Sequence, residues 1–322
     1  LDTNEGGSGS HRKDDPATWE WSDNPSACIL DYMRNGVYDQ VASPTIDDYG
    51  EQGVYGIGIR NEMIDFSSFV TASTECNDSF TDGTYTLTNQ YTLNGAVNVD
   101  NTPFDNLKEM LTSCRGMMIF SGGKYKLVID RAETAETFTF NEDNIVGGWS
   151  IALGGKRDLI NRLRINYIHE ARNWQPDFMV VDNASFRAAD NDLLLEMDVI
   201  LPFTTDQQMA ELIGTRMLNS SRYHLVCELT ATIKGTRCEV GDVVKITHDT
   251  PGWTDKEFRV VQMSMANSDE VRVTLREYNA AAYTTTLTAA DVVPSTNLPN
   301  PLEVAAPGPL GLYQNLQPKT EC

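Results

Sequence analysis

The residue types that most often carry out catalysis are scattered along this chain. Its 322 residues include four histidines, at positions 11, 169, 224 and 248, with no metal-ligand spacing among them. His248 precedes Asp249 and could act as a general base oriented by a carboxylate, but the pair falls in a predicted turn, which favours a solvated histidine. The chain contains no GxSxG, HExxH or Walker-type loop. We therefore predict no catalytic residue, cofactor site or metal site, and no enzyme activity.

Two glycine-containing stretches approach nucleotide-binding motifs without matching them. Gly56 and Gly58 begin a GxGxxG-like run, but Asn61 stands where the third glycine is required. Lys124 follows two glycines, yet the glycine spacing and the following helix of a phosphate loop are absent. Neither stretch predicts a bound nucleotide.

The six cysteines form no CxxC pair, which argues against a zinc ribbon or a thioredoxin-type site. They lie at positions 28, 76, 114, 227, 238 and 322. The first three fall at apolar positions of predicted helices, where free cysteine behaves as a small hydrophobic residue. We expect reduced thiols and folding in a reducing cytoplasm.

The formal net charge of −21 disfavours nucleic-acid binding as a main activity, because such a surface repels a phosphate backbone. It is compatible with an ordinary acidic surface, or with one past which nucleic acid slides. No run is long enough to span a membrane, and no signal-peptide pattern opens the chain. Because the first residue is Leu1, we expect a piece of a longer protein.

Residues 16–145 are predicted to form an α+β domain. Asn24 is a candidate N-cap, and Pro25 suits the first position of the helix that follows. Further helices are expected to begin near Asp65 and at Thr102, where Pro103 follows. Two hairpin turns are expected, at Asn94–Gly95 and at Gly122–Gly123.

Residues 146–285 are predicted to form a β-barrel-like or sandwich-like domain with one helix as a plug. That helix is expected to begin with a capping box of Thr205 and Gln208. The stretch from Glu239 to Tyr283 alternates in three runs and predicts an antiparallel meander, entered through Gly241–Asp242. The fold class is therefore α+β and β-rich.

The ends and one internal loop have a different composition. Residues 1–15 are predicted to be a linker, and residues 286–322 a proline-rich linker toward a fibronectin-like module outside this chain. The stretch from Val37 to Gly53 is predicted to be a polar surface loop.

The order of several short motifs resembles the family of tip attachment protein J from lambda-like phage tails. The matching positions are Trp21, Asp23, Asn24, Pro25, Tyr55, Gly56, Gly58, Cys76, Gly241, Asp242 and Trp253. GKYKLVID at 123–130 and RNWQPD at 172–177 add to the series, which spans residues 19–283. The chain departs from the family in the longer loop at 37–53 and in Ser26, where we expect alanine.

The resemblance implies a structural component of the virion tail tip with a tail-hub-like fold. Such proteins form a homotrimeric central hub that closes the distal end of the tail tube around the tape-measure protein and later lets DNA pass. Other tail-tip and tail-tube proteins are the implied partners, and a bacterial surface receptor would be reached through C-terminal regions outside this chain. The implied location is the tail tip of the virion, and the host cytoplasm during assembly.

Two alternatives stay open. A carbohydrate-binding surface module would use Trp19, Trp21, Trp174 and Trp253 as stacking rings. A tail-associated cell-wall hydrolase would need a catalytic Asp or Glu whose loss abolishes lysis. Neither alternative explains the ordered series of motifs.

Overall fold

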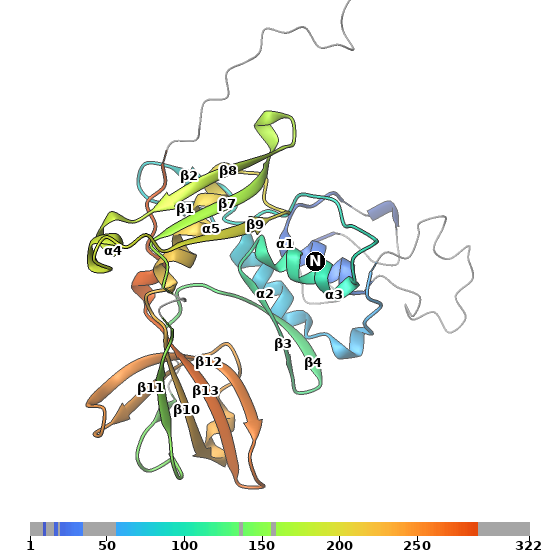
Figure 1. The fold of residues 1–322 in the computed structure, drawn as a ribbon. Helices are drawn as coiled ribbons and strands as arrows, with labels where there is room; N and C mark the ends of the chain where they lie inside the picture. The colour runs from blue at the N-terminus through green and yellow to red at the C-terminus, as the bar shows by residue number, and fades with distance from the viewer. Residues whose placement is uncertain are drawn as a thin grey trace, which may run out of the picture. The chain divides into compact units, whose positions relative to one another are not determined.

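A computed structural model describes residues 9–10, 16–18, 20–34, 56–134, 138–155 and 159–288 (Figure 1). The fold is mixed α+β and β-rich, as predicted. The predicted loop from Val37 to Gly53 lies outside the described residues, as do nearly all residues of the two predicted linkers. No helix within the described residues is long and apolar enough to cross a membrane.

Three helices build the N-terminal part: α1 (Pro25–Arg34), α2 (Phe66–Asn77) and α3 (Pro103–Thr112). Each begins directly after the residue at which a helix start was predicted, which is Asn24, Asp65 or Thr102. The side-chain oxygen of Asn24 accepts the N–H groups of Ser26 at 3.0 Å and Ala27 at 3.3 Å. These three helix starts are confirmed, because a cap satisfies N–H groups that have no partner within the helix.

The hairpin β3 (Gly116–Ser121) and β4 (Lys124–Ile129) turns at Gly122 and Gly123, as predicted. Both glycines have positive φ, +60° and +80°, which suits a two-residue turn between twisted strands.

The predicted turn at Asn94–Gly95 is wrong. The short strands β1 (Phe80–Thr81) and β2 (Thr86–Leu87) pair with each other, and residues 91–98 form no strand. Instead, the N–H of Asn94 donates to the carbonyl of Phe203 at 3.0 Å, and a Cβ on Gly95 would lie 2.6 Å from the Phe203 ring. Gly95 therefore permits a close approach between distant segments.

A three-stranded sheet has the order β8-β7-β9, with β7 antiparallel to β8 and parallel to β9. Its strands are β7 (Arg162–His169), β8 (Gln175–Asp182) and β9 (Glu196–Leu201), with the short helix α4 (Ala184–Ala189) between the last two. Helix α5 (Gln207–Ser220) packs against β7 and β8. Its N-cap is Asp206, whose carboxylate accepts the Met209 N–H at 2.8 Å, so the predicted Thr205–Gln208 capping box is wrong.

A six-stranded sheet has the order β5-β11-β12-β13-β10-β6. Its strands are β5 (Thr139–Phe140), β6 (Ser150–Leu153), β10 (Leu225–Thr232), β11 (Val243–His248), β12 (Trp253–Met265) and β13 (Glu270–Glu277). The antiparallel meander of β11, β12 and β13 is confirmed. Figure 1 shows this sheet curled around its own interior.

The buried apolar residues form two large clusters. One contains residues of α1, α2, α3, β4, β7 and α5, and the other contains Phe140 with residues of β10 to β13. Helix α5 belongs to the first cluster, so the prediction that it plugs the second sheet is wrong. The predicted boundary near residue 145 stays a prediction, although the clusters place residues 160–218 with the N-terminal helices.

After the six-stranded sheet the chain returns to the first cluster. Leu287 is buried there, and its N–H donates to the Asp82 carboxylate at 2.7 Å. The N–H and hydroxyl of Thr288 donate to the two carboxylate oxygens of Glu211 in α5, at 2.8 and 2.9 Å. Both ends of the segment that builds this sheet are thus attached to the same core.

Candidate interaction surface

The three-stranded sheet has one covered face and one open face. Along β7, Leu163, Ile165 and Tyr167 are buried toward α5, whose Gly214 lets helix and sheet approach closely. A Cβ on Gly214 would lie 2.2 Å from the Ile165 side chain. The intervening β7 side chains must point the other way, because successive strand residues alternate between faces.

The open face of this sheet combines exposed apolar side chains, most of them on β8, with the exposed Glu196 and Asp198 of β9. Cross-strand register places Phe178 and Ile200 on either side of Asn166, and Val180 opposite Arg164. Exposure is 53% for Phe178, 45% for Val180 and 69% for Ile200, so this face lacks a covering layer among the described residues. The Arg164 guanidinium lies 4.4 Å from the centre of the Phe178 ring, an arrangement that gives a cation a favourable place over an aromatic face.

Both edges of this sheet are also open. Among the described strands, β8 and β9 each pair only with β7, and they run in opposite directions. An edge strand presents unpaired N–H and C=O groups that can pair with another chain. Apolar side chains beside two open edges therefore make this sheet a candidate surface for assembly, which we call the open sheet.

The loop between β7 and β8 presents an exposed tryptophan in a strained conformation. Asn173 and Trp174 both have left-handed backbones, with φ of +57° and +60°. That conformation is costly for a bulky residue, and yet Trp174 is 54% exposed. The loop is held because the Trp174 N–H donates to the His169 carbonyl at 3.1 Å. Strain of this kind concentrates at functional positions.

An ion cluster supports the base of that loop. The Asp177 carboxylate lies 3.1 Å from Nδ1 of His169, which is buried, and 3.2 Å from the Arg172 guanidinium. Burial alone would raise the pKa of Asp177. The hydrogen bonds from His169 and from the Phe178 N–H, together with the Arg172 charge, lower that pKa below its usual value. Asp177 therefore stays ionised and anchors the start of β8.

The first group of motif positions lies where α1 meets α2. Beyond capping α1, the Asn24 amide donates to the Ser73 carbonyl at 3.0 Å and to the Asn77 side chain at 2.9 Å. Pro25 is buried as the first residue of α1. Asn24 therefore ties the start of one helix to the end of the other.

The neighbouring motif positions form backbone links. The Asp23 carbonyl accepts the Leu93 N–H at 2.7 Å, and the carbonyl of the buried Cys76 accepts the Tyr91 N–H at 3.1 Å. Trp21 is 82% exposed. The structure brings Asp23, Asn24, Pro25 and Cys76 to one structural junction.

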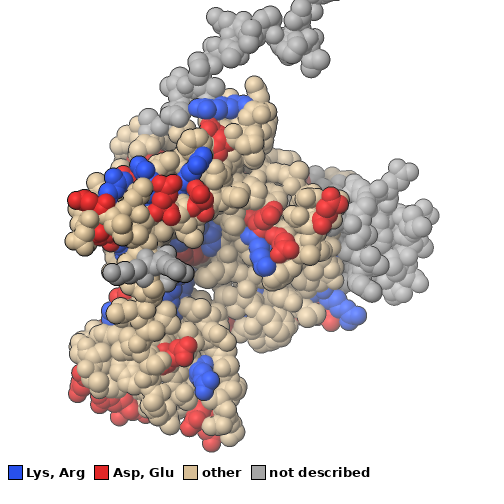
Figure 2. Space-filling view, viewed as in Figure 1, with Lys and Arg blue, Asp and Glu red and all other residues tan. Residues whose placement is uncertain are grey.

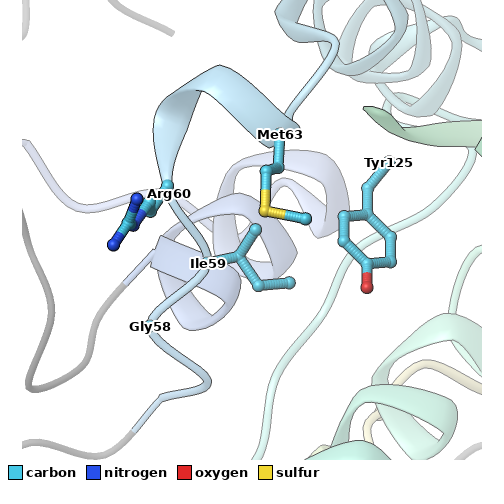
Figure 3. A pocket seen from close by; sticks show the side chains of 5 residues that line it. All are labelled: Gly58, Ile59, Arg60, Met63 and Tyr125. Atoms are coloured by element: carbon cyan, nitrogen blue, oxygen red, sulfur yellow. The ribbon is translucent and has the colours of Figure 1, made fainter. Parts of the chain in front are cut away.

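The Gly-x-Gly step lies beside a pocket of about 330 Å³. Tyr55 lies outside the described residues, and Gly58 has a φ of +77°. The lining residues are Gly58, Ile59, Arg60, Met63 and Tyr125. Ile59, Met63 and Tyr125 point toward one another, whereas Arg60 points away (Figure 3). Ligand sites usually add a few convergent polar groups to an apolar wall, and this pocket does not indicate a cofactor.

Gly241 and Asp242 form the turn that leads into β11. Gly241 has a φ of +101°, and its N–H donates to the Val260 carbonyl at 2.8 Å. The Asp242 carboxylate accepts the N–H of Glu239, three residues earlier in the chain, at 2.7 Å. The Gly241 carbonyl accepts a hydrogen bond from Arg259 at 2.9 Å.

Trp253 and His248 pack together with Trp149 at the other end of β11. The Trp149 ring centre lies 4.5 Å from that of His248 and 5.6 Å from that of Trp253. The prediction that His248 is a solvated turn residue is therefore wrong, because its side chain is mostly buried and packs against an aromatic ring. The spacing of residues in the sequence could not reveal this contact. Trp253 also contacts Phe258, so it is part of the packed interior and does not join Trp174 in a flat exposed platform.

Within the described residues, no group of three or more His, Cys, Asp or Glu side chains could hold a metal ion. Charged residues of both signs alternate over the α4 end of the open sheet, and acidic side chains gather at the lower end of the six-stranded sheet in the view of Figure 2. The arrangement offers contact surface, and the exposed apolar side chains of the open sheet are a part of it that the motifs did not single out. Apolar residues at successive positions of β8 place apolar side chains on both faces of the strand, and this pattern could have predicted the exposed face.

Comparison with known proteins identifies the family. Residues 102–263, which run from the start of α3 into β12, match the family described as putative phage tail protein. The chain belongs to this phage tail protein family. The matched range covers the open sheet, α5 and most of the six-stranded sheet, while α1 and α2 lie outside it.

A curated relative is the baseplate hub protein pb3 of Escherichia phage T5, which is 22% identical over 186 residues. The match covers 58% of this chain but only 20% of the relative's length. The chain is therefore similar to about one fifth of that protein.

Solved structures that resemble parts of this phage tail protein share little sequence with it. A chain in the virion of a native gene transfer agent particle covers 60% of this chain and 42% of its own length, with 12% identity and a TM-score of 0.49. The 43 kDa tail protein of prophage MuSo2 from Shewanella oneidensis covers 56% and 55%, with 15% identity and a TM-score of 0.38.

Proposed function

We propose that this phage tail protein is a structural, non-enzymatic part of a central tail hub, in which copies of the chain close the distal end of the tail tube. Membership in a phage tail family and similarity to a protein named as a baseplate hub support this proposal. The observation that carries it is the open sheet, whose exposed apolar side chains and two edges, unpaired among the described strands, suit assembly into a larger structure.

The sheet suggests how three copies would assemble. Because β8 and β9 run in opposite directions, rotation about an axis along the strands would bring β9 of one copy antiparallel to β8 of the next. Such head-to-tail contacts close into a ring when the rotation allows it. The motif resemblance to tip attachment protein J supplies the expectation of three copies, and the role of its motif residues stays a prediction.

The other partners of the hub belong to the same proposal. Tail-tube and other tail-tip proteins would contact the ring, and the tape-measure protein would end within it. A net charge of −21 would keep DNA from adhering as it passes. Contact with a bacterial receptor would come through regions of a longer protein, and the hub would be assembled in the host cytoplasm before residing at the virion tail tip.

The first experiment is immunogold electron microscopy of phage particles with an antibody against residues 16–285. Gold at the tail tip is the expected result. Particles without gold at the tip would contradict the hub, and glycan binding by the purified chain would then favour the carbohydrate-binding alternative that Trp21 and Trp174 leave open.

The second experiment tests the open sheet in assembled particles. A phage defective in this chain is complemented with Val180→Asp, which places a charge on the open face, or with the matched control Val261→Asp. Val261 is 52% exposed on β12 of the other sheet. We expect Val180→Asp to lower the titre of infectious particles by about tenfold or more, because charges within the core of an interface are costly. Equal titres for the two variants would contradict assembly through the open sheet.

A further inference from the structure

Trp174 stands at a position where a large side chain does not help the chain to fold. Its φ of +60° and the +57° of Asn173 are left-handed, and glycine or asparagine adopts such a backbone at a smaller cost. The indole is 54% exposed, so burial within the chain offsets little of that cost. A strained residue that stays exposed is better explained by binding than by stability.

The loop that carries Trp174 is fixed in place. The 3₁₀ turn η5 (Glu170–Arg172) follows β7, and the Asn173 N–H donates to the Glu170 carbonyl at 3.0 Å. The Trp174 N–H donates to the His169 carbonyl, and the ion cluster described above holds His169. A side chain presented by a fixed backbone loses little conformational entropy when it binds a partner.

A pocket elsewhere on the chain suits a large apolar side chain. Ile59, Met63 and Tyr125 point toward one another in it, beside the 3₁₀ turn η4 (Asn61–Met63) (Figure 3). Phe120 lies directly opposite Tyr125 in the β3–β4 hairpin, and its 57% exposed side chain continues the apolar surface. The volume of about 330 Å³ is close to the smallest ligand sites, about 300 Å³, and it suits one large side chain. We call this pocket, with Phe120, the hollow.

The walls of the hollow are bonded to the elements around them. The Ile59 N–H donates to the Met33 carbonyl of α1 at 2.8 Å, and the Asp65 N–H donates to the Tyr125 carbonyl at 2.9 Å. The Met63 side chain is 38% exposed, and methionine makes favourable contacts with aromatic rings. The hollow is therefore formed before a partner arrives, and an indole is a suitable occupant.

The charges beside Trp174 and beside the hollow are opposite in sign. Arg60 lies at the hollow and points away from its interior, and Glu170 precedes Trp174 in the same loop (Figure 3). Both side chains are exposed, and neither forms an ion pair within the described residues. An indole that enters the hollow from another copy can therefore be accompanied by a pair between Glu170 and Arg60 at the rim.

We propose that Trp174 of one copy docks into the hollow of the next copy and joins copies of this chain head to tail. A contact between two different patches repeats from copy to copy, and it closes into a ring where the rotation allows. The inference rests on the proposed function, which brings several copies together, and it adds a contact distinct from the open sheet. Both partners of the contact are present on every copy, so no other protein is needed to form it.

The test is cysteine crosslinking between two copies with different peptide tags, in infected cells and in the particles that they release. A phage defective in this chain is complemented with one copy carrying Ala171→Cys, beside Trp174, and another carrying Glu62→Cys, beside the hollow. Both positions are exposed. Cys28 and Cys322 are replaced by serine in both copies. A short bismaleimide should give a species that carries both tags.

A matched control places the second cysteine elsewhere. Asp269→Cys, at the exposed turn between β12 and β13, takes the place of Glu62→Cys. We expect the species with both tags to be about tenfold less abundant with this control, because Asp269 does not line the hollow.

Substitutions in both copies test the two parts of the contact. Trp174→Asn removes the indole and suits the left-handed backbone, so the chain should fold while the crosslinked species falls by about tenfold or more. Arg60→Glu and Glu170→Arg should each lower its yield, and the two together should restore it, because the opposite pair forms again. Arg272→Glu, at an exposed position of β13, should leave the yield unchanged.

The results separate this contact from the hub itself. Two results would overturn the contact: a crosslinked species no more abundant than in the Asp269→Cys control, or an equal yield with Trp174→Asn. Immunogold at the tail tip without the crosslinked species would keep the hub and overturn the contact. A crosslinked species in infected cells that depends on Trp174, with tips free of gold, would support the contact and contradict the hub.

Discussion

Strand β13 of the six-stranded sheet and strand β8 of the open sheet are both eight residues long, but they differ in the residues that they place on their exposed faces. In β13, buried Val271, Val273 and Leu275 alternate with outward polar residues. In β8, Met179 and Val181 face the first cluster, while Phe178 and Val180 are apolar on the exposed side. A strand that is apolar on both faces is typical of a sheet covered on both sides. The comparison teaches that β13 keeps its apolar residues on one buried face, whereas β8 also exposes apolar residues on a second face that is suited to a partner.

The largest effect should come from a charge in the closed interior. Val273→Asp would bury a carboxylate at a fully buried position within an apolar cluster, and we expect a loss of about 4 kcal/mol or more in the free energy of unfolding. Urea unfolding followed by circular dichroism measures it. A loss below about 1 kcal/mol would show that this interior admits water, which would break the comparison.

The next effect concerns the covered face of the open sheet. Gly214→Ala would place a methyl group where only 2.2 Å separates the new carbon from the Ile165 side chain. We expect a net loss of about 1–3 kcal/mol, because overpacking exceeds the gain in helix propensity. Thermal unfolding measures the change, and Gly148→Ala, which meets nothing within 4 Å, is the control. If adding Ile165→Val to Gly214→Ala restores part of the lost stability, the loss is due to this contact.

A smaller effect tests the strained loop that extends the open sheet. Trp174→Asn and Trp174→Val both remove the indole, but asparagine tolerates a left-handed backbone and valine does not. We expect the valine variant to be less stable than the asparagine variant by about 1–2 kcal/mol, measured by chemical unfolding. Equal stabilities of the two variants would mean that the loop can leave the left-handed conformation without cost, and that the surrounding structure does not impose it.

The smallest effect is expected on the open face itself. Val180→Asp should change the free energy of unfolding of the isolated chain by no more than about 0.5 kcal/mol, since the side chain is already half exposed. The same urea measurement as for Val273→Asp gives the comparison directly. A loss as large as that of Val273→Asp would show that the face is covered within a single copy.

Local signals predicted much of the fold. The helix starts at Asn24, Asp65 and Thr102, the turn at Gly122–Gly123 and the meander each depend on a few neighbouring residues, and each appears in the structure. The errors arose where distant segments meet. Asn94–Gly95 has the composition of a hairpin turn, but its backbone bonds to Phe203, more than one hundred residues away.

The same limit applies to the candidate surface. Motif positions such as Asn24 and Gly241 could be singled out from sequence, and the structure places them at junctions within the fold. The open face could not be assigned, because it depends on which side of β8 receives α5. The ion pair of Arg259 with Asp130 was equally hidden, since the two residues are far apart in the chain and neither lies in a recognisable motif.

The return of the chain to the first cluster has a mechanical consequence. Because Leu287 and Thr288 are bonded to Asp82 and α5, tension applied at Thr288 is transmitted into the helical core. The force then passes from Thr288 to the helical core without passing through the six-stranded sheet, so the sheet carries little of it. A pull from that end would first shear the two short attachments at Asp82 and Glu211, and the sheet would be loaded only after they break.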